Sequence, residues 1–150
     1  MASAYPFFEV AERLEETCAR IYEALAGLFS GQPGASALFA RLAGEERQHA
    51  SRIRLLAVRY RHDAGLLRGA DTAASRLRPL LAEAEAVLEQ VRAGAWAADL
   101  AIVRGELMDL EDRFQAAHAH VIATLADPGL KRFFEQMATQ DGAHRDLLRG

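Results

Sequence analysis

The chain has very little cysteine: Cys18 is its only one among 150 residues. A single thiol excludes an internal disulfide and any metal site built from paired cysteines, and it favours a reducing compartment. No apolar run approaches the roughly 20 residues that a membrane-spanning helix needs. The N-terminus also lacks the basic start and apolar core of a signal peptide. We therefore expect a cytoplasmic protein with no membrane partner.

An excess of positive charge is lacking as well. The net charge is −3 and the sequence pI is about 6.0, so no basic surface for nucleic acid is indicated. Hydrophobic residues make up 51% of the chain and charged residues 26%, which is typical of a soluble globular protein. A chain of 150 residues can bury one core, so we expect a single domain over residues 1–150 and no nucleic-acid partner.

Strand patterns are missing too, because no segment alternates apolar and polar residues and helix formers dominate. Apolar residues instead recur at spacings of three and four, which predicts amphipathic helices. Ser30–Gly34 is a clear break, and Asp127 followed by Pro128 is a helix start. The predicted long helices cover about residues 5–29, 36–60, 97–126 and 128–148.

The connection between the second and third long helices is itself long. We expect a loop over His62–Gly69, and then a shorter helix capped by Asp71 and running to about Arg92. Pro79 could kink or split this helix, which leaves its start open. Short links make the first two and the last two long helices antiparallel pairs. The predicted fold is therefore all-α: a ferritin-like four-helix bundle with one long crossover that contains an additional short helix.

The two halves of the chain carry near-copies of one motif. Residues 38–49 and 133–144 each place a carboxylate and a histidine three residues apart, with an aromatic residue seven positions before the carboxylate. Residues at i and i+3 share one helix face. A further glutamate holds a matching place in the first and third long helices, which indicates a duplicated helix pair. The polar residues of this repeat are Glu15, Glu46, His49, Glu111, Asp141 and His144.

These six residues point to the bundle axis, where an uncompensated carboxylate is costly to bury. Two divalent cations would neutralise the four acids, and oxygen and imidazole ligands suit iron, manganese or zinc. We therefore predict that all six residues are metal ligands. Glu46 and Asp141 are expected to bridge or chelate between the two ions, and Glu15 and Glu111 are expected to be terminal ligands.

Other residues near this pattern have more than one interpretation. Tyr22 lies two turns after Glu15, where it could donate a hydrogen bond or an electron as a catalytic residue, or pack in the core. His118 holds the matching place in the third long helix and is expected to support a ligand or pack in the core, with an extra metal ligand as the alternative. The alternative to metal binding as a whole is a polar core layer paired with Arg20 or Arg52.

At these residues the chain resembles the rubrerythrin-like branch of the ferritin-like superfamily. The resemblance is carried by Glu15 with Tyr22 seven residues on, by Glu46-Arg47-Gln48-His49-Ala50, and by Phe133-Phe134 ahead of Asp141-Gly142-Ala143-His144. It implies a non-haem di-iron carboxylate site in a four-helix bundle. Members of this family reduce hydrogen peroxide or oxidise ferrous iron, and many are dimers.

The chain departs from rubrerythrins in three respects. It has no group of four cysteines for a rubredoxin-like domain, so electrons would come from an external donor. Asp141 stands where glutamate is usual, and Phe114 stands where rubrerythrins have an additional carboxylate. Glu106 and Asp109 lie near Glu111 but off its apolar stripe, so we expect both to be solvated.

The resemblance and the ligand pattern together predict an oxidoreductase. We expect two iron ions, with manganese or zinc as alternatives, that react with peroxide or dioxygen in a homodimer. A ferroxidase or iron-handling protein, for which ferrous iron is the substrate, is one alternative function. A non-enzymatic helical bundle that serves as an interaction module is the other.

Overall fold

The computed structural model describes residues 5–60 and 70–150, and within these ranges the chain forms five helices and no strand. The prediction of an all-α fold is confirmed, whereas the expected loop His62–Gly69 lies outside the described residues. None of the helices in the described ranges is long and apolar enough to cross a membrane. The helices are α1 (Tyr5–Leu28), α2 (Pro33–Tyr60), α3 (Ala70–Arg92), α4 (Leu100–Thr124) and α5 (Pro128–Arg149).

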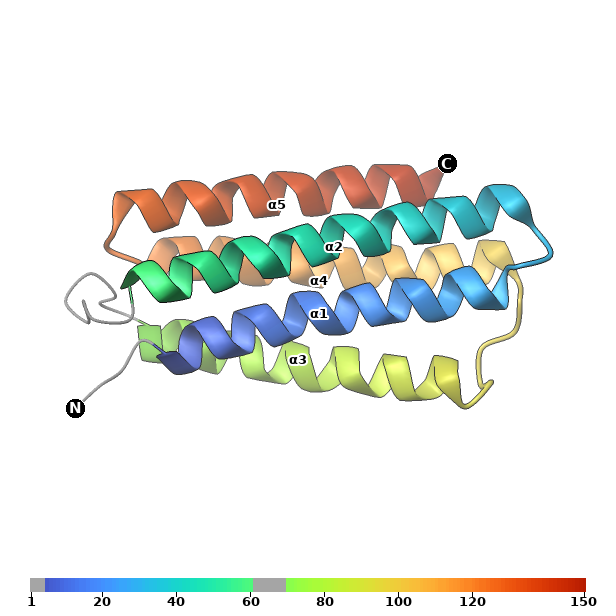
Figure 1. The fold of residues 1–150 in the computed structure, drawn as a ribbon, viewed down its shortest axis with the longest axis horizontal. Coiled ribbons are helices and arrows are strands. Elements are labelled where there is room, and N and C mark those ends of the chain that lie inside the picture. Colours follow the sequence, from blue (N-terminus) through green and yellow to red (C-terminus); the bar gives the residue numbers. More distant parts are fainter. Residues whose placement is uncertain (1–4, 61–69) are drawn as a thin grey trace.

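The five helices lie side by side along the long axis of the molecule (Figure 1). α1 packs along both α2 and α3, and α4 packs along α5, whereas α2 and α5 meet at few points. Short links join α1 to α2 and α4 to α5, so each of these pairs is antiparallel, as predicted. The long connection from α2 to α4 contains α3, which covers the outer side of α1 and α4.

The helix in the crossover ends at the predicted Arg92, but it is about as long as α5 and so is not short. α3 has 23 residues against 22 in α5, and Asp71 lies inside the helix instead of capping it. Pro79 lies within α3 and is exposed, although a proline in a helix interior costs about 3 kcal/mol. A buried stripe on both sides of the proline offsets this cost by packing into the core. It consists of Ala73, Ala74, Leu77, Leu80, Leu81, Ala84, Leu88 and Val91.

Two aspartates begin the helices of the second pair. The Asp127 side chain accepts a hydrogen bond from the Leu130 backbone N–H at 2.9 Å, with Pro128 in the first turn, so this predicted start is confirmed. Asp99 accepts from the Ile102 N–H at 3.3 Å, so α4 begins later than the predicted residue 97.

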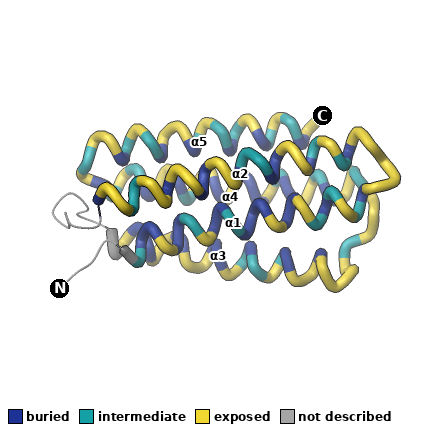
Figure 2. The backbone as a smooth tube through the Cα atoms, in the orientation of Figure 1, coloured by how far each residue is buried: buried dark blue, intermediate teal, exposed yellow. Residues whose placement is uncertain are grey.

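The buried faces of the helices point to the centre of the bundle (Figure 2). Aromatic rings fill much of this core: Phe39 stacks on Tyr22, and Phe134 packs against Phe7 and His118. Within the described ranges, the buried polar and charged residues form a short list, and all of them except Thr17 belong to one cluster. The cluster consists of Glu15, Glu46, His49, Glu111, His118, Asp141 and His144.

Candidate metal centre

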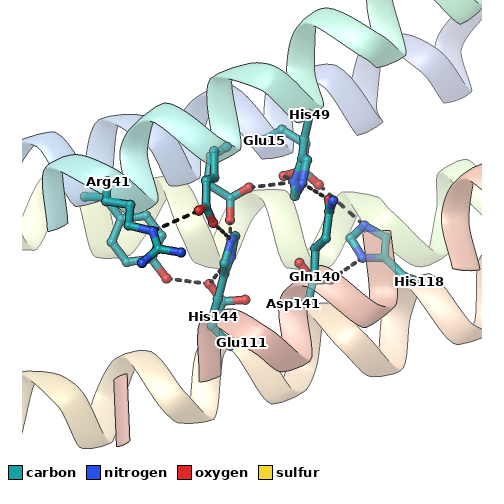
Figure 3. Close-up of polar contacts among 11 residues, drawn as sticks. Glu15, Arg41, His49, Glu111, His118, Gln140, Asp141 and His144 are labelled. Atoms are coloured by element: carbon teal, nitrogen blue, oxygen red, sulfur yellow. Dashed lines mark hydrogen bonds and ion pairs between the residues drawn. The ribbon is translucent and has the colours of Figure 1, made fainter. Parts of the chain in front are cut away.

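Four helices contribute to the central cluster, and every member is at most 3% exposed. The inward stripe of α1 supplies one member, and each of the other three helices supplies a pair (Figure 3). The structure thus brings together all six residues that were predicted as ligands, and it adds His118. Their role as metal ligands stays a prediction, which the geometry supports as follows.

The cluster divides into two groups that could each hold one ion, with ligand atoms within 4.8 Å of one another. Position 1 consists of Glu46, Glu111, Asp141 and His144. Position 2 consists of Glu15, Glu46 and His49. Glu46 belongs to both groups, which fits the predicted bridging role.

Asp141 differs from that expectation, because it belongs to position 1 alone. Its side chain is one methylene shorter than glutamate. Its Oδ2 atom lies 2.5 Å from His118 Nδ1, so the carboxylate is held toward α4 instead of spanning the two positions.

Both histidines of the repeat turn the same ring nitrogen inward. His144 Nδ1 lies 3.1 Å from Glu46 Oε1 and 3.6 Å from Glu111 Oε1, and His49 Nδ1 lies 3.5 Å from Glu46 Oε2. The outer Nε2 of His144 lies 2.7 Å from Glu45 Oε2. An ionised carboxylate can only accept, so Nε2 donates, and Nδ1 of the neutral ring keeps a lone pair for an ion.

His49 has the same arrangement with a different partner. Its outer Nε2 is hydrogen-bonded to Gln140 Oε1, so Nε2 donates to an amide oxygen and Nδ1 again faces the carboxylates. Glu45 and Gln140 were not identified from the sequence. Each directly precedes the carboxylate of its motif, but its partner is the histidine of the other helix, which spacing along one helix does not show.

Five inward atoms of the cluster are buried without a hydrogen-bond partner. They are both oxygens of Glu46, Oε2 of Glu111, and Nδ1 of His49 and of His144. A buried polar atom that lacks a partner costs about 1–3 kcal/mol. Two divalent cations would satisfy these atoms and neutralise the four carboxylates, so the residues present fit a pair of iron, manganese or zinc ions.

The pKa shifts indicate which groups of the metal-free centre favour their protonated form. Burial, and then the charge of Glu46, raise the pKa of Glu15 well above its usual range. Burial raises the pKa of Glu111 to about 7, although His144 opposes this shift. Burial opposes the charged form of Glu46 as well, but Glu15 and the two nearby histidines lower its pKa overall.

The pKa of His144 is shifted as well. Burial alone would lower its pKa, but the carboxylates of Glu111 and Glu46 raise it to about 11. The metal-free centre therefore holds a proton on His144 at neutral pH and part of one on Glu111, and the raised pKa of Glu15 favours the protonated form of that carboxyl group.

A metal ion must displace these protons, so we expect metal affinity to rise with pH. Glu111 is protonated below pH of about 7 and His144 keeps its proton up to about 11, so the competition extends over the whole range from pH 6 to 9. The apparent affinity should rise about tenfold per pH unit for each proton released. Calorimetric Mn²⁺ titrations in two buffers of different ionisation enthalpy measure this release, and an affinity independent of pH would contradict it.

Tyr22 contacts a different carboxylate from the one expected. Its hydroxyl donates to Glu111 Oε1 on α4, and not to Glu15 on its own helix. His118, its counterpart in the repeat, has Nε2 at 3.5 Å from Glu15 Oε1. Each half of the chain thus supports a carboxylate of the other half. Burial, and then the charge of Glu111, raise the pKa of Tyr22, so the phenol keeps its proton.

Arginines do not neutralise the cluster. Arg20 and Arg52 are exposed, and within residues 5–60 and 70–150 no ion pair joins an arginine to the seven clustered residues. The alternative of an arginine-paired core layer is therefore wrong. Glu106 and Asp109 are exposed, as expected.

A pocket of about 270 Å³ lies between α2 and α5, over the outer edges of both histidines. The pocket borders the cluster, because His49 and His144 belong to its lining. Its lining is Arg41, Glu45, Gln48, His49, Arg52, Gln140, Ala143, His144 and Leu147.

Fold and cluster together define a ferritin-like helical bundle with buried carboxylate and histidine groups able to bind metal. The family model described as Rubrerythrin matches residues 7–128, which is most of the chain, and the chain belongs to the rubrerythrin family. No curated protein and no solved structure matches the chain. Since the matched region ends before Asp141 and His144, the placement of these two residues rests on the structure.

Proposed function

We propose that this protein is a non-haem di-iron oxidoreductase that reacts with peroxide or dioxygen, with manganese as the alternative metal. The observation that carries the proposal is the set of unpartnered buried atoms on Glu46, Glu111, His49 and His144, grouped at two positions that share Glu46. The rubrerythrin family, whose members have a di-iron carboxylate site, supports the choice of iron.

The bound ions would each supply one electron, so that one peroxide molecule takes up two electrons and two protons and yields two water molecules. The Tyr22 hydroxyl donates a hydrogen bond to Glu111 at the edge of the cluster, and it is the candidate proton donor. The helices exclude bulk water from the cluster, whose members are at most 3% exposed. The pocket between α2 and α5 is the proposed entry for the oxidant.

In this proposal, an external electron donor restores the reduced state. The donor, a homodimeric assembly and a cytoplasmic location are parts of the same proposal.

The test is anaerobic loading with ferrous iron, followed by rapid mixing with peroxide or with dioxygen while near-ultraviolet absorbance is recorded. We expect one peroxide to oxidise the two irons of one chain, and repeated turnover with an added reductant. Tyr22→Phe should keep its iron and slow the oxidation by about tenfold, because water replaces a positioned acid less effectively.

Glu106→Gln is the control, because Glu106 is exposed on α4. This substitution should leave the rate unchanged. Iron that binds but reacts with neither oxidant would disprove the proposal. Sustained oxidation of excess ferrous iron, with ferric product leaving the centre, would favour the ferroxidase alternative.

A further inference from the structure

The two metal positions are unequal, although the internal repeat relates them. Position 1 offers three carboxylates and a histidine, whereas position 2 offers two carboxylates and a histidine. The difference arises from Asp141, which joins position 1 alone. In a buried site, one more negative donor attracts a divalent ion more strongly.

The two histidines differ in the group that accepts a hydrogen bond from the outer ring nitrogen, Nε2. Glu45 accepts from His144 Nε2 at 2.7 Å, and Arg41 Nε holds the same carboxylate at 3.1 Å. The partner of His49 Nε2 is the neutral amide of Gln140. A carboxylate on the outer nitrogen makes the inner nitrogen a more basic ligand than an amide does.

We propose that the chain loads its two ions in order, position 1 first, and that Glu45 and Gln140 are the positioning residues that separate the two affinities. This inference rests on the proposed function in assuming a metal pair, but it concerns the order of binding. When metal is scarce the chain would hold one ion, and the complete pair would form only when metal is abundant. Activity would then follow metal supply.

The experiment is a titration of the metal-free chain with Mn²⁺, followed by electron paramagnetic resonance and calorimetry. In the unaltered chain we expect two resolved steps whose affinities differ by at least about tenfold. The signal of an isolated ion should grow during the first step. It should then give way to the signal of a coupled pair during the second.

Two reciprocal variants assign the steps. Glu45→Gln should weaken the first step by about tenfold and leave the second unchanged, whereas Gln140→Glu should strengthen the second by a similar factor. Gln48 provides the control, because it is exposed in the same pocket and neither outer histidine nitrogen is bonded to it. The double variant Glu45→Gln/Gln48→Glu keeps the pocket charge but removes it from His144, so it should behave like Glu45→Gln.

Three results would overturn the inference: two equal steps in the unaltered chain, a second step that Gln140→Glu does not strengthen, or recovery of the first step by Gln48→Glu. The readout also separates the two proposals. A chain that loads in order but reacts with neither oxidant would disprove the proposed function alone. A chain that reacts but binds both ions equally would disprove the ordered loading alone.

Discussion

Replacing Glu46 with glutamine is expected to abolish binding of both metal ions, because Glu46 belongs to both positions. Both of its oxygens are buried without a hydrogen-bond partner, and the amide keeps the size of the side chain while it removes the charge. Each binding step should weaken by more than about 100-fold, since even residues behind the ligands account for about 10–100-fold. Elemental analysis after anaerobic iron loading and desalting should fall from about two irons per chain to near zero.

Glu106→Gln is the control for this experiment, since it makes the same chemical change on α4 at an exposed site. It should retain about two irons per chain. Circular dichroism should show that both variants keep their helices. If Glu46→Gln retains both ions, the cluster is not the metal site. If it loses only one ion, Glu46 serves one position and the shared ligand is another residue.

The polar residues at the centre could be predicted because each signal lies within one helix. The spacing of Glu46 and His49 repeats in Asp141 and His144, and the apolar stripes around Glu15 and Glu111 place these acids on buried faces. Periodicity determines which residues of a helix face inward, and burial makes an inward carboxylate unusual enough to notice.

Contacts between helices could not be predicted in the same way. The partner of Tyr22 proved to be Glu111, because the choice depends on how α1 and α4 are rotated and shifted against each other. Spacing within one helix contains no such information. The bonds from His144 to Glu45 and from His49 to Gln140 were missed for the same reason.

Local signals predicted the extent of the crossover helix better than its continuity. The prediction reached about Arg92 but left open a kink or split at Pro79, whereas α3 is one helix because its leucines and alanines are buried on both sides of the proline. Packing of a long apolar stripe outweighs one missing hydrogen bond. A strong local breaker therefore predicts the end of a helix only where the flanking residues have little to bury.

Removing the metal is expected to lower the melting temperature substantially. The proposed ions would bind the folded cluster, whereas the unfolded chain has no preformed site, so binding would add to the free energy of unfolding. At free metal about 1,000 times the dissociation constant of one position, the gain from the ion at that position is about 4 kcal/mol. With about 2–4 °C per kcal/mol for a domain of this size, the melting temperature should rise by about 8–16 °C. Thermal unfolding followed by circular dichroism, with Mn²⁺ or with a chelator, measures the difference.

Glu15→Gln tests whether this gain comes from the cluster itself. Burial and the charge of Glu46 raise the pKa of Glu15, which favours its neutral form in the metal-free chain, and glutamine resembles that neutral form. The metal-free variant should therefore melt within a few degrees of the unaltered chain, while the gain from metal shrinks because position 2 has lost a charged ligand. A variant that melts far lower without metal would show that Glu15 is ionised and paired in the metal-free protein. An undiminished gain from metal would show that Glu15 does not bind an ion.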